Sequence, residues 1–125
     1  MFHNRLHAVV SQVESSSVIM LGLLILNLAF NILANAAFKV SAFSPNWRGI
    51  LTWQVIGNLA GFITVLTLTG LLRYMPLSIA FPLTTGLTIL GVQVVAAHFY
   101  FHESISYMQW WGTLLITLGV FFIYK

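Results

Sequence analysis

Four long apolar runs constrain this chain more than any other feature of its sequence. They cover residues 18–38, 51–72, 77–100 and 107–124, and short polar segments separate them. A helix needs about 20 mostly apolar residues to cross a hydrocarbon core of about 30 Å, and each run is close to that length. The runs lack the alternating polarity of membrane-barrel strands. The sequence therefore predicts an all-α membrane protein with four transmembrane helices.

Charged residues are too scarce for a water-soluble domain. They make up 6% of the 125 residues, with five Lys or Arg against two acidic side chains and a net charge of +3. In soluble domains about a quarter of all residues are charged. We therefore expect this chain to lie in a lipid bilayer, which is its expected partner. The basic residues stand singly, which excludes the clustered footprint of a nucleic-acid-binding protein. The chain has no cysteine, and this excludes disulfides and thiolate chemistry.

Two parts are expected along the chain. Residues 1–17 form a polar or interfacial N-terminal tail without the pattern of a cleavable signal peptide. Residues 18–124 form the four-helix transmembrane domain, and its short connections make successive helices antiparallel neighbours in a hairpin bundle.

The orientation in the membrane is only weakly specified. One side would hold Arg5, Arg73 and Lys125, and the other side Lys39 and Arg48. Lysine and arginine in short loops set the orientation of a membrane protein. Three basic residues on one side against two on the other give almost no bias. This balance is compatible with insertion both ways round and an antiparallel homodimer, and also with an ordinary subunit held by a partner.

A row of polar side chains runs along the first helix. Asn27, Asn31, Asn35 and Lys39 follow one another at intervals of four residues, so they share one slowly drifting face. Amides are too costly to expose to hydrocarbon, so this face must point at another helix or at a water-filled cavity. Two readings stay open: hydrogen bonds that hold helices together, and a pathway for a solute.

The second and third helices offer matching polar faces. On the second helix Gln54 and Asn58 share a side with a GxxxG pair, which permits close helix approach. On the third helix Pro82 removes a backbone donor, and with Gly86 it predicts a kink. No arrangement of acids, histidines and nucleophiles supports catalysis. We therefore expect neither an enzyme, nor a metal site, nor a cofactor.

The order of several short motifs resembles the drug/metabolite transporter superfamily. These motifs are Phe38-Lys39-Val40-Ser41, the stretch PLSIAFP from Pro76 to Pro82, Gly86, Glu103 in the third loop and W-G-x6-G in the last helix. Among its four-helix, small multidrug resistance-like and EamA-like members, the pattern is most similar to the flippase subunits for undecaprenyl-phosphate-linked aminoarabinose.

The resemblance implies a dimer, often antiparallel, with a substrate cavity between the first three helices. Gly112 and Gly119 match the dimerisation stripe of the family on the last helix. The chain departs from the multidrug exporters at three positions. Asn31 stands where they carry a glutamate that exchanges protons, and Phe81 and Thr84 stand where they carry a tyrosine and a tryptophan. Lipid-linked-sugar flippase subunits also lack that glutamate.

We therefore expect a transporter or flippase subunit in a bacterial inner membrane, working as a homo- or heterodimer on a lipid-linked sugar or another polar-headed, amphipathic solute. Two alternatives stay open: a non-transporting subunit that stabilises a larger membrane complex, and a cation or multidrug exporter that uses another charge. The expected solute pathway comprises Asn27, Asn31, Asn35, Lys39, Gln54, Asn58, Phe81, Thr84 and Thr85.

Overall fold

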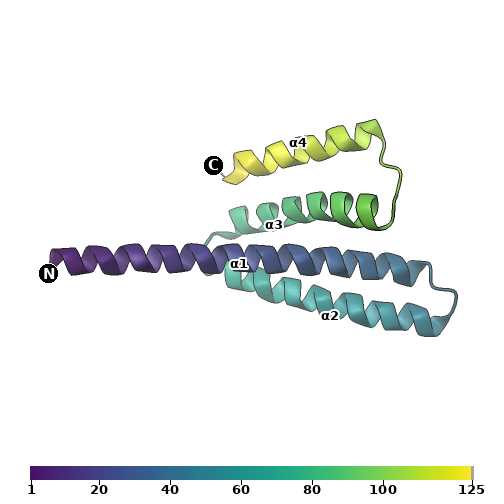
Figure 1. Ribbon diagram of the computed structural model, residues 1–125, viewed down its shortest axis with the longest axis horizontal. Coiled ribbons are helices and arrows are strands. Elements are labelled where there is room, and N and C mark those ends of the chain that lie inside the picture. The colour runs from purple at the N-terminus through teal and green to yellow at the C-terminus, as the bar shows by residue number, and fades with distance from the viewer. Residues whose placement is uncertain (125) are drawn as a thin grey trace.

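The computed structural model describes residues 1–124, except for the side chain of Val13. Its helices are α1 (Phe2–Ala42), α2 (Trp47–Leu71), α3 (Leu77–Gly91) with the π-helix η1 (Val92–Tyr100) directly after it, and α4 (Tyr107–Tyr124). Figure 1 shows their arrangement. Four helices, with α3 and η1 counted together, are long and apolar enough to cross a membrane. The predicted all-α class and its four candidate spans are confirmed. Lys125, which entered the charge count above, lies outside the described residues.

Helix boundaries follow local capping signals. The third and fourth predicted runs coincide with α3–η1 and α4, whereas α2 begins at Trp47 instead of residue 51. Asn46 explains this earlier start, because its side chain accepts a hydrogen bond of 2.8 Å from the backbone N–H of Gly49 and so caps the helix.

Helix α1 is much longer than its predicted span. It has 41 residues, or about 60 Å at 1.5 Å per residue, which is twice the hydrocarbon thickness. Residues 2–17, which the sequence set apart as a tail, continue the helix without a break, and its N-terminal part projects beyond the other helices (Figure 1). No glycine or proline precedes Gly22, so nothing in the sequence ends the helix earlier.

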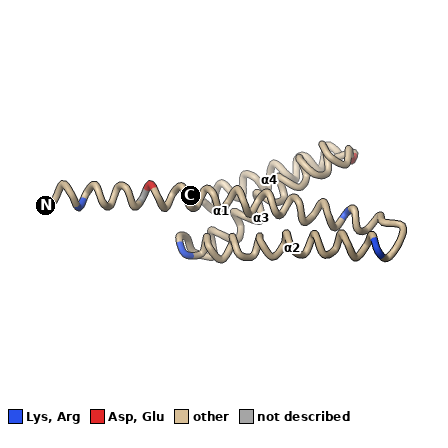
Figure 2. Tube along the Cα trace, turned by 60° about the horizontal axis from the view of Figure 1, so that its bottom comes forward, with Lys and Arg blue, Asp and Glu red and all other residues tan. Residues whose placement is uncertain are grey.

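Helix α1 lies in the centre of the bundle. It packs against α2 on one side and against α3 and η1 on the other, while α4 packs against α3 and, through side chains, against η1. Small residues fill much of the buried core, including Ala34, Ala37, Ala60 and Ala80, and they allow close helix approach. Lys, Arg and Glu lie at the two ends of the bundle and in the projecting part of α1 (Figure 2). The finer expectation of a small multidrug resistance-like bundle stays a prediction.

Helix α3 runs unbroken past the expected kink residues. It contains Pro82 and continues to Gly91, and the departure from α-helical geometry comes later, in the π-helical residues Val92–Tyr100. Gly86 is buried, and a Cβ atom there would collide with the side chain of Val120 on α4. The structure therefore gives Gly86 a packing role between α3 and α4.

Candidate solute-binding site

The asparagine row, defined as Asn27, Asn31 and Asn35, changes from buried to exposed along α1. Asn27 is only 3% exposed, and its Nδ2 donates to the Thr64 carbonyl and to Thr67 Oγ1, both at 3.0 Å. These bonds join α1 to α2 and use both N–H groups of the amide. Asn27 therefore serves as interhelical glue.

The other two members bond mainly within α1. Asn31 Nδ2 donates to the Asn27 carbonyl at 3.0 Å and to Asn27 Oδ1 at 2.9 Å. Asn35 Nδ2 donates to the Asn31 carbonyl at 2.8 Å, and the side chain is exposed. Neither residue has a hydrogen bond to another helix within the described residues. Their amide oxygens therefore remain available to a solute.

Two adjoining cavities follow the asparagine row. The Thr84 cavity, of about 250 Å³, lies between α1, α2 and α3 and is lined among others by Thr64, Thr84, Thr88 and Ile89. The Gln93 cavity, of about 410 Å³, lies between α1, α3–η1, the third loop and α4 and is lined among others by Thr88, Ile89 and Gln93. Because Thr88 and Ile89 line both, the two cavities are neighbours along α3.

Several expected pathway residues meet at these cavities. Five come together in the Thr84 cavity, and one lines the Gln93 cavity. The five are Asn27, Asn31, Phe81, Thr84 and Thr85, and the sixth is Asn35. The Thr84 hydroxyl donates to the Ala80 carbonyl at 2.9 Å, so its hydrogen is already used within α3.

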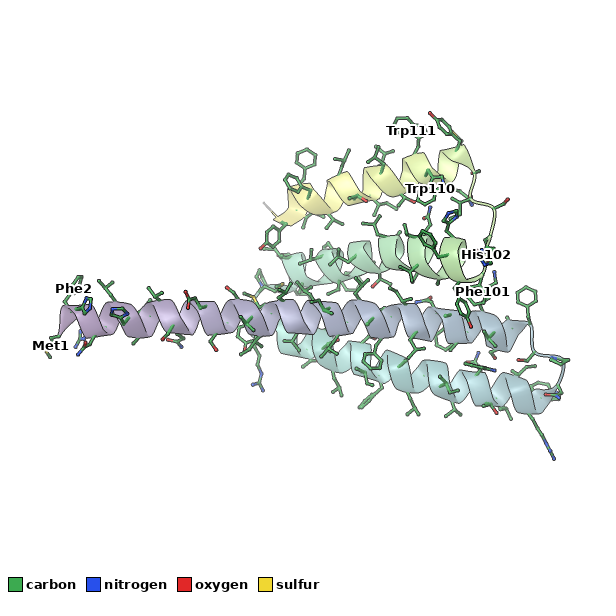
Figure 3. All side chains as sticks on the ribbon, in the orientation of Figure 1. Met1, Phe2, Phe101, His102, Trp110 and Trp111 are labelled. Atoms are coloured by element: carbon green, nitrogen blue, oxygen red, sulfur yellow. The ribbon has the colours of Figure 1, made fainter. Side chains whose placement is uncertain are left out.

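Lys39 pairs with an acid from the third loop. Its ammonium forms an ion pair with the carboxylate of Glu103, and it lies 4.7 Å from the ring centre of Phe101 and 5.9 Å from that of Phe43. Figure 3 shows Phe101 at this end of the bundle, close to α1. Lys39 and Glu103 are 31% and 43% exposed, so both are partly shielded. The pair leaves no net charge beside the Gln93 cavity.

Gln54 and Asn58 line neither of the two cavities. Gln54 Nε2 donates to Ser41 Oγ at 3.2 Å, and Ser41 Oγ donates to the Ile50 carbonyl at 2.9 Å. Asn58 Nδ2 donates to the Gln54 carbonyl at 2.7 Å. The bonds of Ser41 connect the end of α1 to the first half of α2, and the Asn58 bond lies within α2.

The sequence places Gln93 on the polar face of the third helix together with Thr85, but the predicted pathway left out Gln93, Ser104 and Gln109 and the pairing of Glu103, all of which belong to the Gln93 cavity. One signal was available for the Lys39–Glu103 pair. Antiparallel helices bring the end of the first helix and the third loop to the same side of the membrane, where two opposite charges can pair. The polar face of the third helix marks Gln93, but its place in a cavity depends on how α4 packs against α3 and η1.

The two C-terminal histidines take different places. The His98 ring lies edge-on to Trp110, with ring centres 5.9 Å apart, and Figure 3 shows Trp110 directed toward η1 and Trp111 directed away from it. His102 has a positive φ of 54° and ends the turn after η1. Among the described residues no three His, Cys, Asp or Glu side chains lie close enough together to hold a metal ion.

Comparisons with protein-family models, with curated proteins and with solved structures found no match for this chain. The resemblance in its motifs therefore stays a hypothesis.

Proposed function

We propose that this chain is a transporter or flippase subunit that moves a polar-headed, lipid-linked or amphipathic solute across a membrane. The observation that carries the proposal is the alignment of the asparagine row with two adjoining cavities. Polar side chains inside a membrane-spanning bundle are costly, and they commonly mark substrate pathways. Here they supply amides and hydroxyls over more than two turns of α1 and the facing part of α3.

The chemistry of the pathway favours a hydrogen-bonding solute over a simple cation. Asn31 cannot change its charge, and Lys39 and Glu103 neutralise each other. A head group with hydroxyls can donate hydrogen bonds to the amide oxygens of Asn31 and Asn35, whose Nδ2 atoms are already bonded within α1, while an apolar chain stays in the surrounding lipid. The bacterial inner membrane and a dimeric assembly belong to the same proposal, and the motif resemblance supports both.

Asn31→Ala is the direct test of this function. The full chain is reconstituted into phosphatidylcholine liposomes with traces of fluorescent glucosylceramide or, separately, fluorescent phosphatidylcholine. Accessibility of the fluorophore to dithionite then reports movement between the leaflets. We expect the wild type to move at least one probe, and we expect Asn31→Ala to lose most of that activity because the middle of the asparagine row is removed.

Asn4→Ala is the matched control, since Asn4 is exposed on the projecting part of α1. It should keep wild-type activity. If Asn31→Ala instead unfolds the protein or changes its assembly, Asn31 belongs to the packing and not to the pathway. A folded wild type that moves neither probe would contradict the proposed function.

One observation favours a second candidate, the non-transporting membrane subunit. Helix α4 packs on one side only, against α3 and η1, and Tyr107, Leu115 and Phe122 on it are 66–75% exposed. A larger protein partner could cover this surface. Purification in a fixed ratio with another membrane protein, without lipid movement, would support this candidate. The third candidate, a cation exporter that uses Glu103 or a histidine, requires uptake driven by a pH gradient.

A further inference from the structure

Gln93 carries a buried hydrogen-bond donor without a partner. Its Oε1 accepts a hydrogen bond of 2.6 Å from the Thr113 hydroxyl of α4. Its Nε2 is buried and makes no hydrogen bond. Among the described residues no other buried side-chain nitrogen or oxygen lacks a hydrogen-bond partner. An unsatisfied buried donor is costly, and native proteins keep few of them. Gln93 is therefore the polar group most in need of an additional acceptor.

The same residue lines the larger cavity. The Gln93 cavity, of about 410 Å³, also contains Asn35, Ser104 and Gln109. The Nδ2 of Asn35 is bonded within α1, which leaves its amide oxygen as an acceptor, whereas Gln109 Oε1 is engaged by the backbone N–H of Ser106 at 2.7 Å, which leaves its N–H groups as donors. A ligand here meets donors and acceptors together.

The charge around the cavity is compensated. Glu103 lines it, but its carboxylate forms the ion pair with Lys39. A cationic head group would have to compete with Lys39 for Glu103, and an anionic one with Glu103 for Lys39. A neutral head group can bind without breaking that pair.

We propose that Gln93 binds the solute directly, its Nε2–H donating to a hydroxyl or carbonyl oxygen of an uncharged head group in the Gln93 cavity. The Thr113 hydroxyl holds Oε1, so the nitrogen is the end left without a partner. Because Nε2 is buried, the Gln93 side chain turns toward the cavity when the solute binds. This inference rests on the proposed function and adds to it the charge class of the head group and a contact residue.

The test compares two lipids with the same acyl chains. The full chain is placed in phosphatidylcholine nanodiscs that contain either monoglucosyl dioleoylglycerol, whose head is neutral and hydroxylated, or dioleoyl trimethylammonium propane, whose head is a cation without hydroxyls. Native mass spectrometry measures how much of each lipid stays bound. The wild type should retain the glucosyl lipid preferentially, and Gln93→Leu should weaken this retention about tenfold, the scale of one hydrogen bond.

Two further variants separate binding from folding. Gln93→Glu keeps the oxygen that accepts from Thr113 but removes the N–H donor, so it should also weaken retention even where Gln93→Leu fails to fold. Gln12→Leu makes the same change at an exposed position on the projecting part of α1, and it should retain the lipid as the wild type does.

Equal retention of both lipids by the wild type would overturn the inference, as would wild-type retention by folded Gln93→Leu and Gln93→Glu. A failure of the Gln93 contact can be told apart from a failure of the proposed transport function. If Asn31→Ala abolishes lipid movement while the Gln93 variants bind normally, the function stands and the Gln93 contact is wrong. If binding depends on Gln93 but no lipid moves, the cavity is a binding site without transport.

Discussion

At the scale of the residue, the members of the asparagine row have different roles despite their regular spacing. Asn27 is buried and donates both amide hydrogens to α2, one to the Thr64 carbonyl and one to the Thr67 hydroxyl. Asn35 is exposed and bonds only to the preceding turn of its own helix. Of the two readings left open by the sequence, the hydrogen bonds of Asn27 fit a role in holding helices together, while a pathway role for the exposed end of the row stays a prediction.

Asn27→Ala should therefore destabilise the fold much more than Asn35→Ala. Loss of the Asn27 amide removes two bonds between α1 and α2, and it should lower the free energy of unfolding by about 1–2 kcal/mol, high in the range for membrane hydrogen bonds. Asn35→Ala should change it by less than about 0.5 kcal/mol. Unfolding in mixed micelles by a denaturing detergent measures both. Equal losses would show that the row acts as one structural unit.

At the scale of the element, glycines decide how closely the helices approach. A Cβ at Gly86 of α3 would collide with Val120 of α4, and one at Gly57 of α2 would collide with the ring of Phe38 on α1. Gly61 is the other member of the GxxxG pair, and a Cβ atom added there would meet no other atom within 4 Å. Sequence spacing identified the pair, but only the packed helices show which member is in contact.

Gly86→Ala should disturb the contact between α3 and α4. The side chain of Val120 is β-branched and has few alternative rotamers, so the added methyl group should cost about 1–3 kcal/mol in unfolding free energy. Gly61→Ala is the matched control and should be neutral or slightly stabilising, since alanine favours helices. Thermal unfolding followed by circular dichroism compares them. An unchanged Gly86→Ala protein would mean that α4 moves away at little cost.

At the scale of the whole molecule, α4 is attached to the bundle on one side only. It packs against α3, and Cβ atoms added at Gly112 and Gly119 would meet no other atom within 4 Å. These two residues, predicted as the dimer interface, are therefore not used for packing within the described chain. The dimer itself stays a prediction.

Gly119→Leu should weaken self-association and leave the single chain folded. A large side chain on the predicted dimer face blocks close helix approach, so we expect at least a tenfold increase in the dimer dissociation constant, measured by fluorescence energy transfer in liposomes. Gly22→Leu is the control, because Gly22 is equally open but lies outside the predicted interface. A dimer that tolerates Gly119→Leu but not Gly22→Leu would place the interface on α1.

The four apolar runs, their antiparallel order and the regular spacing of the asparagines are properties of the sequence alone, since hydropathy and helical period are local. The tertiary structure decided the rest. It continued α1 through residues 2–17, placed π-helical geometry at Val92–Tyr100, and brought Gln93, Glu103 and Asn35 together around a cavity that Gln54 and Asn58 do not line. Those outcomes depend on which helix faces touch, and side chains far apart in sequence settle that jointly through steric fit and hydrogen bonding.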